Sequence, residues 1–384
     1  MRVSRTTSTS VYINTSILKI NLNIIKSMTP YKVISVLKSN AYGLGINNIL
    51  PWIINNIYKV AINDVEEFFE FKLYNYPINF ILFFPEIDRN VMDDIVRYKN
   101  VEASVNSYEM LNILSGMRDK KIRVHLEVDT GMNRTGIRYD NRIGISENIE
   151  LVGLYTHLKS DNLEDNVEQI VKFYEFIKNN QIDVKGVDIS ILSSSGVMNY
   201  DLLKKVNNYK VNFILGICNS VRVGILQYGI VPSTKYLGLK KGLNLQSCVK
   251  MEVGFLGSKL VKKGETVGYT GRYVHCMDKD LRIGLAYLGY SKIPFSQNLR
   301  FDVVTNKRRF LTNSVGSMSM DVIAFDLSDL GDDEIVKKIY LFSENIDIEV
   351  QAENNNHLVY NFLTSLSPLK KYLNGGDEVS KNTE

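Results

Sequence analysis

The sequence lacks the features that mark several large classes of protein. Its only cysteines are Cys218, Cys248 and Cys276, which fit a reducing compartment, the cytoplasm, better than a disulfide framework. The longest apolar runs, such as residues 78–84, are far shorter than a membrane span. The net charge of +4 is spread along the chain without a dense Lys/Arg block. We therefore expect no nucleic-acid or membrane partner, and no residue cluster indicates a metal ion.

The first part of the chain also lacks acidic residues, since Asp64 is the first one. A Ser/Arg-rich start without acidic residues is typical of a transit peptide. A short tail is the alternative, and we favour it because ordered-looking sequence begins by about Val11. The polar residues 376–384 are expected to fray.

Short β-branched runs recur through the first 230 or so positions. Hydrophobic residues make up 45% of the chain, which is enough for a large core without disulfides or metals. Segments 64–74 and 166–180 between these runs have helical spacing. Eight strands alternating with helices favour a TIM-like (β/α)8 barrel over residues 11–235, with a doubly wound open sheet as the alternative. The expected strands are residues 31–37, 58–62, 78–84, 101–105, 122–128, 149–156, 187–193 and 221–226.

After about residue 240 the pattern changes. Segments such as 281–290 and 308–327 alternate apolar and polar residues and carry glycine-bearing turns. We therefore expect a second, mainly antiparallel β domain over residues 236–375, with residues 1–10 as a candidate addition to it.

Polar side chains follow several of the expected barrel strands, at the end where barrel active sites lie. Lys38 follows the first strand, Arg134 the fifth and His157 the sixth, and Arg222 lies in the eighth. Each has an ordinary explanation alone: a strand-end lysine extends to solvent, a histidine packs in the core, and the Ser-Ser-Gly of residues 193–196 forms a turn. Together they suggest one site. A lysine can form a Schiff base with an aldehyde, and Ser/Gly loops bind a phosphate dianion, so the set fits pyridoxal phosphate.

These motifs resemble those of the alanine racemase family, which uses pyridoxal phosphate. "VLKSNAYGLG" implies Lys38 as the Schiff-base residue and Tyr42 as a phosphate contact. "VDTGMNRTG" implies that Arg134 holds the phenolic oxygen of the cofactor and the substrate carboxylate. "GLYTHL" places His157 beside the cofactor. In "SSSG", Ser195 best matches the family serine that binds the cofactor phosphate, and Ser194, one position earlier, is the alternative match.

The resemblance extends to the end of the first domain and into the second. "NSVRVGILQYGIVPS" implies Arg222 as partner of the pyridine nitrogen, with Gly224 and Ile225 as backbone phosphate donors. "VGYTGRY" implies Tyr269 as the second catalytic base, and "LGY" places Tyr290 at the substrate entrance. "GSMSMD" places Met320 and Asp321 beside the substrate carboxylate.

The family mechanism needs one base on each face of the substrate Cα, and the resemblance implies Lys38 and Tyr269. It also implies a head-to-tail homodimer in which Tyr269 reaches the site of the other subunit. A phenol needs nearby positive charge to act as a base at neutral pH, which His157 or Arg134 could supply. Arg222 can only donate hydrogen bonds, so it favours an unprotonated ring nitrogen and limits side reactions.

Three departures from the family pattern bear on substrate and rate. Glu127 stands where many members carry a carbamylated lysine, and we expect it to position Arg134 without modification. Residues 291–294 read "SKIP" at the expected substrate entrance. The region near Pro368 lacks the arginine and the tyrosine that family members often carry there. The open alternatives are a racemase of serine or a larger amino acid, and a non-catalytic cofactor-binding protein. A decarboxylase of the same fold type fits less well, because Arg222 is the wrong partner for the ring nitrogen.

Overall fold

The computed structural model describes residues 8–84, 88–331 and 333–374. The predicted tail 376–384, and residues 1–7 of the predicted N-terminal addition, lie outside them. The chain forms two compact units. The barrel unit comprises residues 21–41 and 49–227, and the β unit contains the described residues up to 20 together with 42–48 and those from 228 onward. Among the described helices, none combines the length and apolar character needed to cross a membrane.

Eight parallel strands form the barrel unit, in the order β10-β2-β3-β4-β5-β6-β8-β9. Backbone hydrogen bonds from Asn219 N to Ile189 O (3.1 Å) and from Arg222 N to Leu192 O (2.9 Å) join the two ends of this order. The predicted (β/α)8 barrel is therefore confirmed, and each observed strand overlaps a predicted one. The strands are β2 (Lys32–Val36), β3 (Lys59–Ile62), β4 (Phe80–Leu82), β5 (Val101–Val105), β6 (Ile122–Asp129), β8 (Ile149–Tyr155), β9 (Asp188–Ser190) and β10 (Ser220–Val223).

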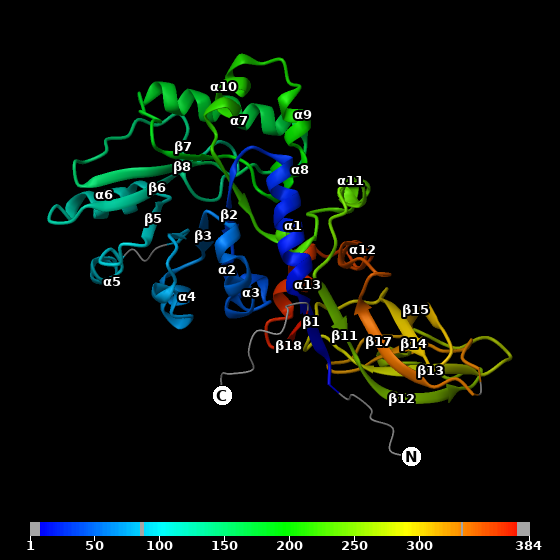
Figure 1. Cartoon of the computed structure of the whole chain (residues 1–384). Helices are drawn as coiled ribbons and strands as arrows, with labels where there is room; N and C mark the ends of the chain where they lie inside the picture. Colours follow the sequence, from blue (N-terminus) through cyan, green and yellow to red (C-terminus); the bar gives the residue numbers. More distant parts are fainter. Residues whose placement is uncertain (1–7, 85–87, 332, 375–384) are drawn as a thin grey trace. The chain divides into compact units, whose positions relative to one another are not determined.

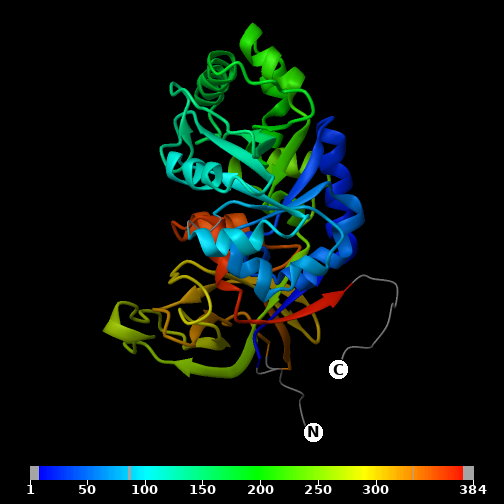
Figure 2. The ribbon, with the colours of Figure 1, turned by 90° about the vertical axis from the view of Figure 1, so that its left-hand side faces the viewer.

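Helices surround these strands (Figure 1, Figure 2). Polar side chains cap the N-termini of several of them: Asp64 accepts a hydrogen bond from Glu67 N, and Asn208 accepts from Lys210 N and Val211 N. The helices of this unit are α4 (Val65–Glu70), α5 (Arg89–Ile95), α6 (Tyr108–Gly116), α7 (Leu163–Asn179), α8 (Ser194–Met198), α9 (Tyr200–Lys204) and α10 (Tyr209–Ile217). The chain passes between the two units within α1 (Thr15–Met28), within α2 (Lys38–Tyr42) between Ala41 and Tyr42, within α3 (Ile46–Ile53), and again between Gln227 and Tyr228.

A buried ionic cluster lies among the barrel strands. Lys59 Nζ is 2.6 Å from Glu102 Oε2 and 2.6 Å from Asp188 Oδ2. His125 Nε2 is 2.6 Å from the same Glu102 oxygen. The two carboxylates and the imidazole could surround a metal ion, but the Lys59 ammonium already lies between the carboxylates. Gly153 leaves room for His125, because a Cβ there would lie 1.9 Å from His125 Nδ1.

The β unit is a nine-stranded sheet in the order β12-β13-β16-β15-β14-β17-β11-β1-β18. All its pairs are antiparallel except that of β1 with β18, so the predicted antiparallel character is confirmed. Sequence reasoning did not predict the helices of this unit, α11 (Leu237–Gly242), α12 (Ile348–Asn354) and α13 (Val359–Ser365). The strands are β1 (Ser10–Asn14), β11 (Val249–Glu252), β12 (Gly254–Val261), β13 (Leu281–Tyr287), β14 (Arg300–Thr305), β15 (Arg309–Val315), β16 (Ile323–Asp326), β17 (Val336–Phe342) and β18 (Lys370–Asn374).

Candidate active site

Lys38 lies just beyond β2, at the carboxyl end of the barrel strands, and is half-buried. Burial lowers the pKa of its amine, and the positive charge of Arg134 lowers it further. The next residues, Ser39 to Tyr42, all have left-handed φ angles between 52° and 56°. A lysine with a lowered pKa has more neutral amine available to attack an aldehyde, so this position suits covalent attachment of a carbonyl cofactor.

The loop that carries Arg134 follows β6 and folds back sharply. Asp129 Oδ1 accepts hydrogen bonds from Gly131 N (2.9 Å) and Asn133 N (3.0 Å). The short strand β7 (Ile137–Arg138) then pairs with the end of β6. Gly136 has φ +103°, and a Cβ there would lie 2.8 Å from Asp129 N. Asp129 and Gly136 therefore shape the loop; sequence reasoning did not single them out, although an Asp two residues before a Gly is a recognisable turn signal.

Glu127 is buried in β6, and its carboxyl group interacts electrostatically with the positive charges of Arg222 and Arg134. Burial raises the pKa of its carboxyl group, while Thr135, the two arginines and Tyr155 act in the opposite direction. An anion at this position can thus interact electrostatically with both arginines.

Arg222 is held rigidly by backbone and side-chain oxygens of two neighbouring strand ends. Its Nη1 donates to Ser190 O (2.5 Å) and Ser190 Oγ (2.7 Å), and its Nη2 donates to Thr156 O (2.6 Å). The guanidinium also lies over the Tyr155 ring. Because a guanidinium has five N–H groups, these three bonds leave donors for a ligand.

His157 follows β8 and is uncharged at neutral pH. Burial lowers its pKa to about 3, and the charges of Arg222, Arg134 and Lys38 contribute. Its backbone oxygen accepts a hydrogen bond from Gln169 Nε2 (3.1 Å). A neutral His157 carries no positive charge that could stabilise a phenolate.

Ser194 and Gly224 lie side by side after β9 and β10. Ser194 is buried, and its Oγ accepts a hydrogen bond from Gly224 N at 3.2 Å. The Ser195 hydroxyl instead lies 3.2 Å from that of Ser193. Ile225, next to Gly224, is fully buried. The two neighbouring hydroxyls thus differ in their contacts: that of Ser194 lies against the Gly224 backbone, and that of Ser195 lies against Ser193.

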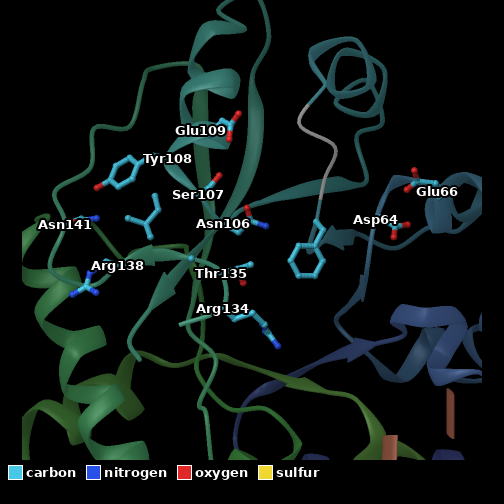
Figure 3. Close-up of a pocket in the computed structure, with 13 residues that line it drawn as sticks. Asp64, Glu66, Asn106, Ser107, Tyr108, Glu109, Arg134, Thr135, Arg138 and Asn141 are labelled. Carbon is cyan, nitrogen blue, oxygen red and sulfur yellow. The ribbon is translucent and has the colours of Figure 1, made fainter. Parts of the chain in front are cut away.

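A cavity of about 740 Å³ opens beside Arg134 in the barrel unit. Figure 3 shows Asp64 and Glu66 on one side of it and Tyr108 and Arg138 on the other. It is lined by Asp64, Glu66, Phe84, Asn106, Ser107, Tyr108, Glu109, Arg134, Thr135, Gly136, Ile137, Arg138 and Asn141. Because it contains both carboxylates and guanidinium groups, it suits a polar occupant.

In the β unit, glycines bring the segments around Tyr269, Tyr290 and Met320 close together. A Cβ on Gly268 would lie 2.7 Å from Ser317 O, and a Cβ on Gly289 would lie 2.2 Å from Met320 O. Backbone hydrogen bonds join Tyr290 N to Ser319 O (3.2 Å) and Ser291 N to Met320 O (2.9 Å). These close approaches require glycine and place three of the sequence-predicted residues in one neighbourhood.

Asp321 lies in the same neighbourhood and is already paired. Its Oδ1 accepts hydrogen bonds from Lys292 Nζ (2.8 Å) and Ser291 Oγ (2.7 Å). The Lys292 ammonium also lies 3.9 Å from the centroid of the Tyr287 ring. The hydrogen bonds from Lys292 and Ser291 lower the pKa of Asp321, which keeps this carboxyl group ionised. The unusual "SKIP" segment therefore supplies a cation beside Asp321.

Tyr42 is also placed in the β unit, where it is buried against two other tyrosines. Its ring centroid is 6.3 Å from that of Tyr228 and 6.2 Å from that of Tyr360. Burial raises the pKa of the Tyr42 phenol, which therefore stays protonated and can donate a hydrogen bond. Sequence reasoning did not single out Tyr360, because nothing in its local sequence distinguishes it from a core tyrosine.

Comparison with known proteins shows the family of the chain. Residues 13–232 match the alanine racemase N-terminal domain, and residues 249–372 match the alanine racemase C-terminal domain. The chain belongs to the alanine racemase family. This is a family of pyridoxal-phosphate-dependent isomerases, so the predicted family and cofactor are confirmed.

Individual relatives share most of the length of the chain. An alanine racemase of Borreliella burgdorferi is 27% identical over 381 residues, covering 94% of this chain and 96% of the relative. The biosynthetic alanine racemase of Pseudomonas aeruginosa has the same fold, with a TM-score of 0.79, 19% identity, and coverage of 96% and 99%. The alanine racemase of Bartonella henselae, solved with covalently bound pyridoxal phosphate, has a TM-score of 0.77 and 21% identity, covering 95% of this chain and 99% of the relative.

Proposed function

We propose that this chain interconverts L- and D-alanine, using pyridoxal phosphate bound in the barrel unit and two bases, Lys38 and Tyr269. The observation that carries the proposal is the position of Lys38. Its half-buried amine has a lowered pKa and lies at the carboxyl end of a barrel strand, in the field of Arg134. This is the environment that an amine needs in order to attack a carbonyl group at neutral pH.

The donor set fits the cofactor. Lys38 would attach to its aldehyde, Arg222 would donate to the ring nitrogen, and neutral His157 would lie beside the ring. Ser195, Gly224 and Ile225 would hold the phosphate, with Ser194 as the alternative hydroxyl and Tyr42 as a further donor. The fit is supported by the spare N–H groups of Arg222, which donates to Ser190 and Thr156 through only three of its five N–H groups. When bound, the cofactor withdraws electrons from the substrate Cα and makes its proton removable.

The side chains of the protein would then control the proton at Cα. Lys38 would remove or return it on one face and Tyr269 on the other. Arg134 would hold the substrate carboxylate together with Met320 and Asp321, and Glu127 would keep Arg134 in place. Tyr290 would line the entrance. Arg222, which cannot give up its proton, would hold the ring nitrogen unprotonated.

We further propose a head-to-tail homodimer in which the site is shared between subunits. The support is the exposure of three apolar or aromatic side chains on the β unit, 66% for Tyr269, 56% for Met320 and 47% for Tyr290. Side chains of this type are enriched at protein interfaces. As sequence domains we propose residues 11–235 and 236–375; the compact β unit also takes in residues 11–20, 42–48 and 228–235 of the first. We propose the cytoplasm as the location, since all three cysteines are free.

The test is to purify the full chain with pyridoxal phosphate and follow three signals. We expect visible absorbance, borohydride trapping of the cofactor on Lys38, and D-alanine formed from L-alanine. Lys38→Ala should abolish all three signals, whereas Tyr269→Phe should keep the absorbance and trapping and lose D-alanine formation. Assays with L-serine test the alternative substrate, because Lys292 changes the entrance. Colour without turnover would support a binding protein, and no colour would refute the proposal.

A further inference from the structure

One carboxylate, that of Glu67, connects two neighbouring strand ends of the barrel unit. Its Oε1 accepts a hydrogen bond from Asn40 N, and its Oε2 accepts one from Asn63 N, both at 2.7 Å. Asn40 follows β2 and Asn63 follows β3. Glu67 is only 9% exposed, so these bonds are largely shielded from water. The turn that begins at Lys38 is thereby attached to the start of α4.

A capping role alone does not explain this contact. Asp64 caps α4 by accepting from Glu67 N at 3.0 Å, and Asp64 with Glu67 has the spacing of a capping box. In that motif the glutamate returns to a backbone N–H at the start of its own helix. Here one oxygen does so at Asn63, but the other reaches Asn40, which lies 27 positions earlier in the chain.

The segment that Glu67 holds is strained. Ser39, Asn40 and Ala41 have φ angles of 54°, 52° and 56°. Left-handed backbone is unfavourable for non-glycine residues, so a run of them persists only if surrounding contacts hold it. Contacts that hold this run include the hydrogen bonds from Ala41 N to Leu37 O (2.7 Å) and from Asn40 N to Glu67 Oε1 (2.7 Å), and the Ser39 N–H also acts on the Glu67 carboxylate.

We propose that Glu67 is a positioning residue for Lys38: by holding the left-handed turn that follows it, Glu67 fixes the direction of the Lys38 amine. The proposal rests on the assignment of Lys38 as the cofactor lysine. Burial raises the pKa of Glu67 while the N–H groups of Asn63 and Asn40 oppose that shift, and the charge of Glu67 acts on Lys38. Glu67 therefore influences Lys38 through both the backbone and the electric field.

Two variants separate positioning from capping. Glu67→Asp keeps the charge and a carboxylate in the first turn of α4, but it is one methylene shorter and cannot reach both Asn40 and Asn63. Glu67→Gln keeps the length but loses the charge and one acceptor. Glu70→Gln neutralises an exposed carboxylate of the same helix, and Asn208→Ala removes the cap of α10, so they are matched controls for charge and stability.

The measurement is the fraction of full-length chains whose Lys38 is trapped by borohydride as pyridoxal phosphate is titrated, together with kcat, KM and the melting temperature. We expect both Glu67 variants to need about tenfold more cofactor for half-trapping and to lose about tenfold in kcat, with the KM for alanine within about twofold. Asn208→Ala should lower the melting temperature but leave trapping unchanged. Wild-type trapping in folded Glu67→Asp would overturn the proposal. Absence of trapping in the wild-type chain would instead overturn the assignment of Lys38.

Discussion

The guanidinium carbon of Arg222 lies 4.6 Å from the centroid of the Tyr155 ring. The same guanidinium donates to carbonyl oxygens on either side, at Ser190 and Thr156. Planar stacking and a forked pair of donors are both properties that lysine lacks. The geometry therefore depends on arginine specifically, and not on positive charge alone.

We expect Arg222→Lys to lower kcat by roughly 100-fold and stability by about 1–3 kcal/mol, because a buried carbonyl loses its donor. Racemisation is followed by D-alanine formation and stability by urea denaturation. Arg118→Lys, at an exposed position, is the control and should change neither. Wild-type kcat in Arg222→Lys would mean that the ring nitrogen is not held by this side chain.

Glu127→Gln should weaken substrate binding more than folding. The change removes the negative charge that acts on Arg134 and Arg222 while keeping the size of the side chain. We expect kcat/KM for alanine to fall about tenfold, mostly through KM, since a freed Arg134 holds the carboxylate less well. Steady-state kinetics provide the measurement, with Glu150→Gln at an exposed position as the control. Unchanged turnover in Glu127→Gln would refute the role of this residue.

His157 should make stability sensitive to acid. Its pKa is about 3 in the folded chain and near 6.5 when unfolded, so the unfolded chain binds the proton first as pH falls. Stability that is present above about pH 6.5 is lost towards pH 3, by up to about 1.4 kcal/mol per pH unit. Urea denaturation between pH 7 and 5 should therefore show a smaller loss for His157→Gln than for the unchanged chain. Parallel losses in the two proteins would contradict the lowered pKa.

Lys59→Met should be strongly destabilising. It leaves the buried carboxylates of Glu102 and Asp188 without the ammonium that lies 2.6 Å from each. Burial raises the pKa of Glu102, but His125 and Lys59 outweigh it and lower that pKa to about 2, so this carboxylate is charged. Breaking such a pair costs about 3–5 kcal/mol, which urea denaturation can measure. The exposed Lys121→Met is the control, and an equal effect in both variants would contradict a special role for Lys59.

The barrel was predictable because its strands are short β-branched runs, and each run is bounded by polar residues. Lys38, Arg134, His157 and Arg222 could be grouped for the same reason, since they follow or lie in strands whose carboxyl ends meet. The sequence alone could not show which of the three consecutive serines, residues 193–195, presents its hydroxyl to which neighbour. Only the fold shows that the Ser194 hydroxyl lies against Gly224 N and the Ser195 hydroxyl against that of Ser193.

The turn at Ser39 to Tyr42 shows why other features were beyond sequence reasoning. Its residues favour right-handed backbone, and the left-handed run is held in part by a carboxylate 27 positions away. The buried charges of Lys59, Glu102 and Asp188 were missed in the same way. Each looks like an ordinary polar residue at a strand end, and the pairing appears only when strands distant in sequence become neighbours.

A shared site can be tested by mixing two inactive variants. Lys38→Ala removes one base and Tyr269→Phe the other, so each homodimer should be inactive. If the two bases come from different subunits, a hybrid dimer has one site with both defects and one intact site. An equal mixture of subunits should then recover about a quarter of the wild-type activity, and hybrids purified with two different tags about half. Inactive purified hybrids would show that both bases come from one chain, and a monomer by light scattering would reject the dimer itself.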